Sequence, residues 1–471
     1  MFYKAMTSKD ARTENGMPTH STSGDALVDL FFFMGGARNS SDEVVARMFS
    51  RAYAQNAVLA IKAMFYNRDV RGGQGERHTF RVMLNWLATN YPIIAKKVIH
   101  LIPEYGRWDD LFSVFDTEVE VDALQLIVGG LLSRNALCAK WMPREGKKGW
   151  KEYGTKIVNA LGVSPMIYRK ILAQSTRVVE TQMCKNQWDK IEFSHVPSVA
   201  HNRYRNAFVK HARELYAKYL SAVKSGEAKI NASAIFPHDI VHRVLPYGVD
   251  RQAIDSADLQ WKALPDYVPD GKSFIPVCDV SGSMTGQPME VSVALGIYLS
   301  ERNKGAFKDL FFTFSGRPKL VKVVGGNIRE KAVNLRDADW GGNTNIEAMF
   351  RLLVEHAKQY NVPQSEMPDS ILIISDMQFD ECVTTPDASA MEMIRMMYAK
   401  SGYTLPQVIF WNVRNSEGVP VKFDETGTAL VSGFSPSIMK TVLSGELSPL
   451  GIVLKTLNQE RYEKVGIAVV A

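Results

Sequence analysis

The chain has 471 residues, 46% of them hydrophobic, a composition that suits two or three globular domains. Its longest apolar runs, such as residues 30–34, are far too short to cross a bilayer, and its first residues lack the apolar core of a secretion signal, so we expect no membrane association. The cysteines match no zinc-binding spacing and predict reduced thiols in a cytoplasmic protein: Cys138, Cys184, Cys278 and Cys382.

The net charge of +6 is unevenly distributed along the chain. Residues 131–220 hold 17 Lys and Arg against 6 Asp and Glu, a balance of +11, whereas residues 271–471 hold 20 against 22, a balance of −2. A basic stretch of this kind favours a nucleic-acid surface. A solvated helical face without a polyanionic partner is the alternative that composition leaves open.

A helical domain is predicted after a polar N-terminal arm. Residues 1–24 lack periodicity and predict an extended or partly ordered arm, whereas residues 25–265 predict one helix after another. Because no exact repeat period is present, we expect irregular helical hairpins stacked in the manner of HEAT repeats. Only a short linker, 264–270, leads into the next domain, so we expect the helical part to curve and bring both of its ends near that domain.

A glycine-rich turn over residues 71–77 interrupts the early helices. It lacks the Gly-Lys-Ser/Thr ending of a phosphate-binding loop and follows no strand, which excludes a nucleotide site of that kind. A tight interhelical turn is expected instead, with glycine supplying positive φ. Arg68, Arg71 and Arg77 remain candidates for phosphate contacts.

Aromatic residues are interleaved with the cations of the basic stretch, among them Trp141, Trp188 and Tyr204. Rings that stack on bases and cations that neutralise phosphates suit single-stranded nucleic acid. The alternative is that each ring belongs to the hydrophobic core. The expected RNA-binding residues are Lys140, Arg144, Lys147, Lys148, Arg169, Lys170, Arg177, Lys185, Arg203 and Arg205.

Residues 266–471 predict an α/β domain. Strand-like segments at 274–280, 310–314, 370–375 and 407–413 alternate with helical patterns. The helical patterns cover 289–302, 345–359 and 391–399. Strand and helix in alternation indicate a doubly wound, mainly parallel sheet that is covered on both faces.

Three oxygen-bearing side chains follow the first of these strands at alternate positions: Asp279, Ser281 and Ser283. A carboxylate and two hydroxyls on one short loop make a hard-oxygen site suited to Mg²⁺ or Mn²⁺. The region beyond the C-terminal end of a parallel strand is where open α/β sheets bind ligands. A turn that caps the following helix is the alternative.

This spacing resembles the metal-ion-dependent adhesion site, Asp-x-Ser-x-Ser, of von Willebrand factor A domains. Two later segments resemble the other loops of that site, Trp340-Gly-Gly-Asn-Thr-Asn345 and Ile371-Leu-Ile-Ile-Ser-Asp376. The resemblance implies that Thr344 and Asp376 join the first three residues around the cation, directly or through water. It also implies that a partner protein can supply a carboxylate to the metal.

The whole chain resembles the Ro ribonucleoprotein group, in which a ring of helical repeats, the TROVE module, is closed by a von Willebrand factor A domain. It resembles in particular an uncharacterised branch of that group found in viruses, fungi and plants. The resemblance implies an RNA-binding protein, with small structured RNAs bound outside the ring and single-stranded ends bound in its hole. The segments that carry it are Arg68-Asp-Val-Arg-Gly-Gly-Gln-Gly-Glu-Arg77, Ile102-Pro-Glu-Tyr-Gly-Arg-Trp-Asp-Asp110, Trp141-Met-Pro-Arg-Glu145 and Val196-Pro-Ser-Val-Ala200.

Two functional hypotheses follow. In the first, a helical ring binds RNA and the metal-containing α/β domain closes the ring or binds a partner. In the second, the protein is a metal-dependent protein-binding or structural component, of viral type for example, that does not bind RNA. The sequence shows no nucleophile–base pair apart from the metal-site residues, so we do not expect an enzyme.

Overall fold

The structure is a computed structural model of the chain. It describes residues 9–314, 318–336, 344–383, 385–414, 418–445 and 447–471. Within these ranges, no helix combines the length and the hydrophobicity that crossing a bilayer requires.

Residues 26–262 are mainly helical and follow a short hairpin formed by strands β1 (Ala11–Arg12) and β2 (Pro18–Thr19). The rising series of helices is α2 (Ala26–Met34), α3 (Asp42–Gln55), α4 (Ala57–Arg68), α5 (His78–Asn90), α6 (Pro92–Val98), α7 (Ile102–Tyr105), α8 (Glu120–Leu132), α9 (Ala136–Trp141), α10 (Lys151–Leu161) and α11 (Pro165–Ser175). The returning series is α12 (Val179–Cys184), α13 (Ser198–His211), α14 (Arg213–Ser225), α15 (Pro237–Val244) and α16 (Arg251–Lys262). Short 3₁₀ helices connect them: η1 (Ile99–Leu101), η2 (Trp108–Val114), η3 (Trp188–Lys190) and η4 (Phe193–His195).

The remaining residues form an α/β domain around one mixed sheet. Among the described residues the sheet has six strands in the order β5-β4-β3-β6-β7-β8, all parallel except β5. The strands are β3 (Phe274–Asp279), β4 (Leu310–Phe314), β5 (Leu320–Lys322), β6 (Ser370–Ser375), β7 (Gln407–Asn412) and β8 (Thr428–Ser432). Strands β3 and β6 lie in the interior of the sheet and are buried along their whole length, so both of their faces are covered. Strand β8 is also fully buried although it is the last strand of the order, because α2 and α22 pack on it.

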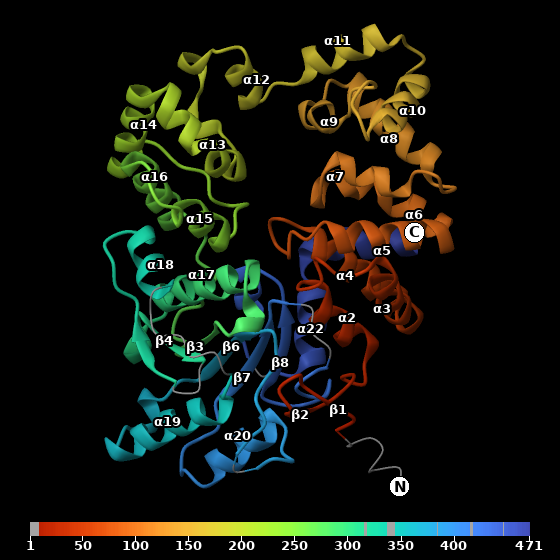
Figure 1. Cartoon of the computed structure of the whole chain (residues 1–471). Helices are drawn as coiled ribbons and strands as arrows, with labels where there is room; N and C mark the ends of the chain where they lie inside the picture. The colour runs from red at the N-terminus through yellow and green to blue at the C-terminus, as the bar shows by residue number, and fades with distance from the viewer. Residues whose placement is uncertain (1–8, 315–317, 337–343, 384, 415–417, 446) are drawn as a thin grey trace.

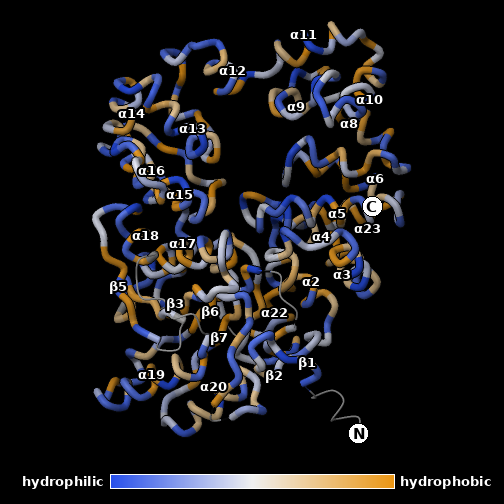
Figure 2. Tube along the Cα trace, viewed as in Figure 1, coloured by the Kyte–Doolittle hydropathy of each residue, from blue (hydrophilic) through white to orange (hydrophobic). Residues whose placement is uncertain are grey.

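Helices cover both faces of this sheet, as the alternating pattern predicts. Figure 1 shows α17 and α18 on one side and α19 and α20 on the other. Hydrophobic residues run along the strands and along the helices packed on them (Figure 2). The helices of this domain are α17 (Gln287–Arg302), α18 (Ile328–Arg336), α19 (Ile346–Gln359), α20 (Ala390–Ala399), α21 (Met439–Val442), α22 (Pro449–Leu457) and α23 (Glu463–Val470). Its 3₁₀ helices are η5 (Gly282–Met284), η6 (Gly305–Phe307), η7 (Gln364–Glu366), η8 (Pro436–Ile438) and η9 (Glu460–Tyr462).

The helical region leaves the α/β domain and returns to it. At its start α2 packs on β8, and at its end α15 packs on α17 and α16 on α18. Between these contacts the helices climb from α3 to α11, cross over at α12 and descend through α13 and α14 (Figure 1). The expected curvature, with both ends brought to the α/β domain, is therefore confirmed.

Both chain ends reach into the opposite region, which the sequence did not indicate. The described part of the arm, residues 9–24, is ordered and lies on the α/β domain, where Gly16 bridges to Asp380 and His20 to Val419. The following helix α2 lies so close to β8 that a Cβ at Gly35 would be 2.7 Å from the Gly433 nitrogen. At the other end α23 packs on α4 and α6. The border between the two regions is therefore crossed twice, so no single cut at residues 24 or 265 separates them.

Candidate functional site

The ends of two neighbouring strands define the candidate metal site. The chain continues from β3 to one side of the sheet, where β4 pairs, and from β6 to the other side, where β7 pairs. This reversal of direction is a topological switch point, where the C-terminal ends of parallel strands leave room for a ligand. Asp279 is the last residue of β3, and Asp376 directly follows β6.

Asp279 is fully buried and held by hydrogen bonds from both strand ends. Its Oδ1 accepts the backbone N–H of Ser281 at 2.9 Å, and its Oδ2 accepts the Ser375 hydroxyl at 2.5 Å. The Ser281 and Ser283 hydroxyl oxygens lie 3.0 Å apart on the loop that follows. The sequence-predicted trio is thus brought together, with its oxygens on one loop.

A second carboxylate lies close enough to act on the first. Asp376 is 1% exposed. Burial, followed by the charge of Asp376, raises the pKa of Asp279 to about 6. The Arg414 guanidinium lies 3.8 Å from Asp376 Oδ2 and donates to the Ser283 carbonyl oxygen, so it gives this carboxylate partial compensation. Among the described residues, no cationic side chain contacts Asp279.

Thr344 is joined to the β6 loop. Its hydroxyl donates to the Gln378 carbonyl oxygen at 2.6 Å and lies 3.0 Å from Asp380 Oδ1, and the Asn15 amide donates to it at 3.0 Å. In the described part of the chain its hydroxyl contacts are therefore with these residues and not with Asp279. Residues 340–343 of the same predicted loop lie outside the described residues. Asn15 and Arg414 carried no sequence signal, because both reach the site from distant parts of the chain.

The donor set fits a small hard cation. Within the described residues no group of three or more His, Cys, Asp and Glu side chains could hold a metal ion. A cation here would depend on two carboxylates, two serine hydroxyls, the Thr344 hydroxyl directly or through water, and further water, all of them oxygen donors. Mg²⁺ and Mn²⁺ accept such sets, and Mg²⁺ characteristically keeps several waters.

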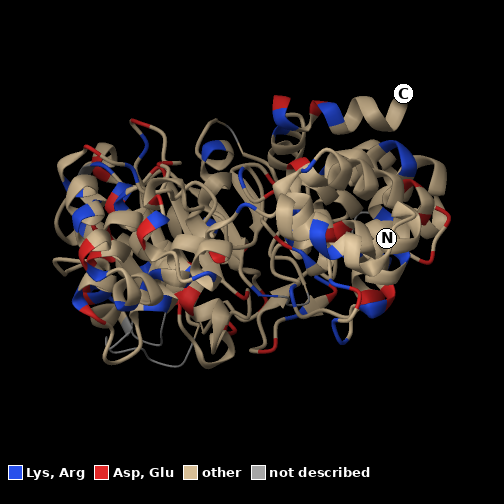
Figure 3. Cartoon of the chain, turned by 90° about the horizontal axis from the view of Figure 1, so that it is seen from above, with Lys and Arg blue, Asp and Glu red and all other residues tan. Residues whose placement is uncertain are grey.

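Three of the predicted RNA-binding residues line one cavity. Lys140, Arg177 and Lys185 line a hollow of about 800 Å³ between α9, the end of α11 and α12. Acidic groups line it as well, and Lys140 pairs with Glu180 at 2.9 Å. Figure 3 likewise shows Lys and Arg positions interspersed with Asp and Glu over the helical region. The basic balance of the sequence is therefore spread over a mixed surface.

Most of the other predicted RNA-binding residues are exposed outside this cavity. Arg144, Lys147 and Lys148 lie between α9 and α10, Arg169 and Lys170 lie on α11, and Arg203 lies on α13. Arg169 is engaged in an ion pair with Glu145 at 2.5 Å.

Arg205 must be removed from the predicted set. Its side chain is buried, and its guanidinium donates to Ser256 at 3.3 Å and to Gln260 at 3.1 Å on α16. An arginine enclosed between α13 and α16 cannot reach an RNA backbone at the surface. Burial of this guanidinium is tolerated because a hydroxyl and an amide oxygen accept hydrogen bonds from some of its N–H groups.

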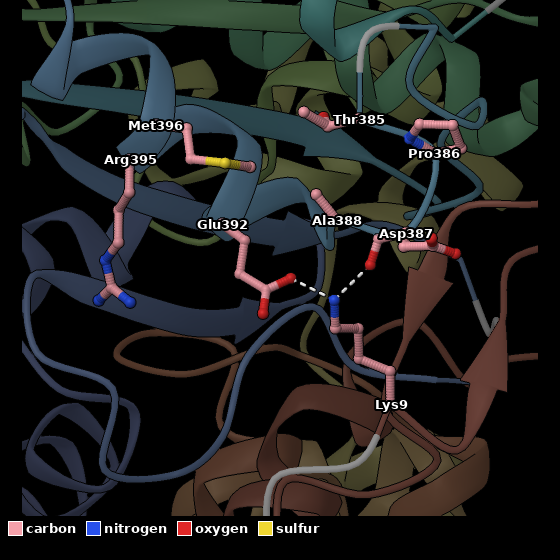
Figure 4. Close-up of a pocket in the computed structure, with 8 residues that line it drawn as sticks. All are labelled: Lys9, Thr385, Pro386, Asp387, Ala388, Glu392, Arg395 and Met396. Carbon is pink, nitrogen blue, oxygen red and sulfur yellow. Dashed lines mark hydrogen bonds and ion pairs between the residues drawn. The ribbon is translucent and has the colours of Figure 1, made fainter.

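Another cavity, of about 560 Å³, marks the place where the N-terminal arm crosses α20. In Figure 4 the Lys9 ammonium points between the Glu392 carboxylate, 2.5 Å away, and the Asp387 carbonyl oxygen, to which it donates. Both acceptors belong to the protein, so this lysine anchors the arm. The lining residues carry both signs of charge and indicate no particular ligand.

Two family models match the chain, and they meet where the last helix before the sheet gives way to the first strand of the sheet. A domain of unknown function (DUF7788) matches residues 273–462, and a second domain of unknown function (DUF2828) matches residues 13–114 and 163–271. The two matches meet between α16 and β3. "Uncharacterized protein L728" of Acanthamoeba polyphaga mimivirus is 31% identical over 501 residues, which cover 95% of this chain and 87% of the viral protein. The chain therefore belongs to the same family as this mimivirus protein.

Proposed function

We propose that the α/β domain binds Mg²⁺ or Mn²⁺ through Asp279, Ser281 and Ser283, with Asp376 and Thr344 completing the site. The observation that carries this proposal is the convergence of two buried carboxylates at the switch point of the sheet. Two carboxylates that are buried close together repel one another, and a divalent cation between them would replace this repulsion by attraction. The strand order and the Asp-x-Ser-x-Ser loop support a von Willebrand factor A-like domain.

The bound cation would serve as an electrophilic anchor for a carboxylate of a protein partner. Only two of the metal ligands that the protein would supply are anionic, so the bound ion would still attract a further anionic ligand. Ser281 and Ser283 would orient it from the β3 loop, and the buried Asp279 would hold those hydroxyls in place through its bond to the Ser281 N–H. We infer a binding role and not an enzymatic one.

The metal proposal is tested with the double variant Asp279→Ala/Ser281→Ala. Calorimetric titration with Mg²⁺ and Mn²⁺ should show a site in the parent chain and none in the variant, while far-ultraviolet circular dichroism stays unchanged. Asp387→Ala, which removes a fully exposed carboxylate, is the matched control and should bind the cation like the parent. A divalent-ion site that persists in the double variant would refute the assignment.

The helical region supports a second function, the binding of small or single-stranded RNA. Its closure on the α/β domain agrees with the Ro-like arrangement, and the cavity lined by Lys140, Arg177 and Lys185 is large enough for a nucleotide. Cations that line a hollow can follow the phosphates of a single strand. HEAT-like stacking of the irregular hairpins belongs to the same proposal.

Filter binding of a single-stranded and a hairpin RNA at several salt concentrations tests this second function. The variant Arg177→Gln/Lys185→Gln should weaken binding and lower the salt slope by about 0.7 for each lost phosphate contact with a single strand. Lys147→Gln/Lys148→Gln tests the exposed loop in the same way, and Arg47→Gln/Arg51→Gln on α3 is the control. If the parent chain binds neither RNA, the metal-dependent protein-binding or structural role without RNA becomes the better hypothesis.

A further inference from the structure

The tip of the β1–β2 hairpin is hydrogen bonded to the loop that follows β6. The buried Thr13 hydroxyl donates to the Phe379 carbonyl oxygen at 2.7 Å. The Glu14 backbone N–H donates to Gln378 Oε1 at 2.6 Å. Because this loop begins with Asp376, the hairpin borders the candidate metal site.

Asn15 links the hairpin to a proposed metal ligand. Its side-chain Nδ2 donates to Thr344 Oγ1 at 3.0 Å and to the Gln378 carbonyl oxygen at 2.7 Å. Thr344 is fully buried, and its hydroxyl donates to the same carbonyl oxygen at 2.6 Å. The three groups form a closed ring of contacts, so the amide and the hydroxyl hold one another in a single orientation.

These partners leave the Thr344 hydroxyl one direction in which it can coordinate. A hydroxyl has one hydrogen and two lone pairs. The hydrogen points to the Gln378 carbonyl oxygen, with Asp380 Oδ1 as a second acceptor 3.0 Å away. The Asn15 amide occupies one lone pair. The other lone pair is available to a cation or to a water bound on it.

The arm also contacts the loop that follows β7. His20 and Val419 exchange backbone hydrogen bonds of 3.1 and 2.7 Å, and the buried Thr19 hydroxyl donates to the Val419 carbonyl oxygen at 2.8 Å. The same loop carries Arg414, whose guanidinium lies 3.8 Å from Asp376 Oδ2. The arm is therefore bonded to both loops that supply the Asp376 side of the site.

We propose that Asn15 is a positioning residue for the metal site, and that the docked hairpin and the bound cation stabilise one another. The inference rests on the metal-binding function proposed above and makes the N-terminal arm part of that site. A ligand that is already held in its binding orientation loses less conformational entropy when the cation binds, so the affinity is higher. Because linkage is reciprocal, a bound cation must favour the docked arm by the same factor.

Calorimetric titration of the full chain with Mg²⁺ and Mn²⁺ tests the role of Asn15. Asn15→Ala should bind the cation about tenfold more weakly than the parent, as is typical when a group that orients a metal ligand is removed. Asn159→Ala, which truncates an exposed asparagine on α10, is the matched control and should bind like the parent. Parent-like binding by Asn15→Ala would overturn the inference and leave the metal-binding function standing.

A double-mutant cycle with Thr344→Val separates positioning from a merely structural effect. Thr344→Val should still bind the cation measurably, because the other proposed ligands remain. If Asn15 acts through the Thr344 hydroxyl, adding Asn15→Ala should not weaken binding further once that hydroxyl is absent. An equal loss of affinity in both backgrounds would mean that Asn15 does not position Thr344, which also overturns the inference.

Limited proteolysis measures the reverse effect and needs no change in the arm. Saturating Mg²⁺ should slow cleavage within residues 9–24 of the parent by about tenfold, provided that the arm opens and closes faster than it is cut. Asp279→Ala/Ser281→Ala should be cleaved equally fast with and without Mg²⁺. Unchanged cleavage of a parent that binds Mg²⁺ overturns the inference alone, whereas a parent that binds neither ion refutes the metal-binding function and the inference together.

Discussion

The carboxylate pair at the ends of β3 and β6 and the arginine cluster at the ends of α4 and η2 are opposite in sign and alike in construction. Asp279 and Asp376 are both buried, and among the described residues Arg414 is the cationic side chain that contacts one of them. In the helical region, two buried aspartates accept hydrogen bonds from three arginines, Arg68, Arg81 and Arg107. Two carboxylates therefore face one guanidinium at the first site, and three guanidinium groups face two carboxylates at the second.

The comparison teaches how to separate structural charge from functional charge. A buried ion can also be matched, as Asp69 after α4 is by Arg461 on η9. Breaking such a matched pair is costly, although the pair itself contributes little net stability. A buried charge without a counter-ion is either satisfied by neutral oxygens, as Arg205 is by Ser256 and Gln260, or compensated when a ligand of opposite sign binds.

The largest effect is expected where a matched network is broken. Asp110→Ala leaves the buried Arg68 without its carboxylate, so the free energy of unfolding should fall by about 3–5 kcal/mol. Urea denaturation measures it. Asp122→Ala removes a half-exposed partner of Lys96 and should cost less than about 1 kcal/mol. Equal losses in both variants would mean that the arginine cluster is not held by its aspartates.

The carboxylate pair should respond in the opposite direction. Asp279→Asn keeps an acceptor for the Ser281 N–H but removes one of the two like charges, so in the presence of a chelator it should be at least as stable as the parent. At a hundredfold excess over the dissociation constant, Mg²⁺ should stabilise the parent by about 2.7 kcal/mol and the variant by nothing. Thermal unfolding with and without Mg²⁺ decides this. A variant that is clearly less stable in chelator would show that the charge is structurally matched.

A buried histidine predicts how the helical region responds to acid. Burial, with a smaller contribution from the charge of Arg205, lowers the pKa of His201 to about 3. The Nε2 atom of its ring lies within hydrogen-bond distance of the Tyr216 hydroxyl on α14 and of the Ser256 hydroxyl on α16. Because the folded pKa lies below the unfolded value of 6.5, the stabilising contribution is present above pH 6.5 and is lost as the pH falls toward 3.

The expected slope is up to about 1.4 kcal/mol per pH unit in that window. Urea denaturation of the parent and of His201→Gln between pH 7 and 5 measures it, and the variant should lose less stability over this range. If both proteins lose the same free energy of unfolding between pH 7 and 5, His201 accepts a proton in the folded state and the prediction is wrong.

The smallest effect is expected at a matched pair on the surface. Lys9→Ala removes the contact with Glu392, whose side chain is 47% exposed, and should change the free energy of unfolding by less than about 1 kcal/mol. Its consequence should appear locally, as faster cleavage of the N-terminal arm by a protease of low specificity. Glu366→Ala on η7, away from the arm, is the control and should leave the cleavage rate unchanged.

Local pattern was sufficient for the strands that carry the candidate site. The expected segments at 274–280 and 370–375 correspond to β3 and β6, because both are continuous apolar runs that end in polar turns. Strand β8 was not anticipated: it has only five residues, all buried, and its packing partner α2 lies about four hundred positions earlier. Such a strand has no alternation that a sequence pattern could reveal.

The burial of single charged residues was the second feature that could not be predicted from the sequence. Arg205 sits in a basic stretch like its exposed neighbour Arg203, and only the helical phase relative to α16 puts one inside and one outside. The pairing of Arg68 with Asp110 is equally hidden, since the two residues lie 42 positions apart in the sequence. The sequence marked these arginines as candidates, but charge matching is a property of the folded neighbourhood.

The crossing of the two chain ends has a consequence for biosynthesis. The apolar faces of α2 and α4 emerge from the ribosome first, yet they are covered by β8, α22 and α23, which are made last. Translation proceeds at about 5–20 residues per second, so the roughly 400 residues from the end of α4 to the end of α23 take about 20–80 seconds to be made. The nascent chain therefore exposes apolar surface for most of the synthesis of this segment, and loss of α23 would uncover the part of α4 on which it packs. We expect folding of this protein to depend on chaperones.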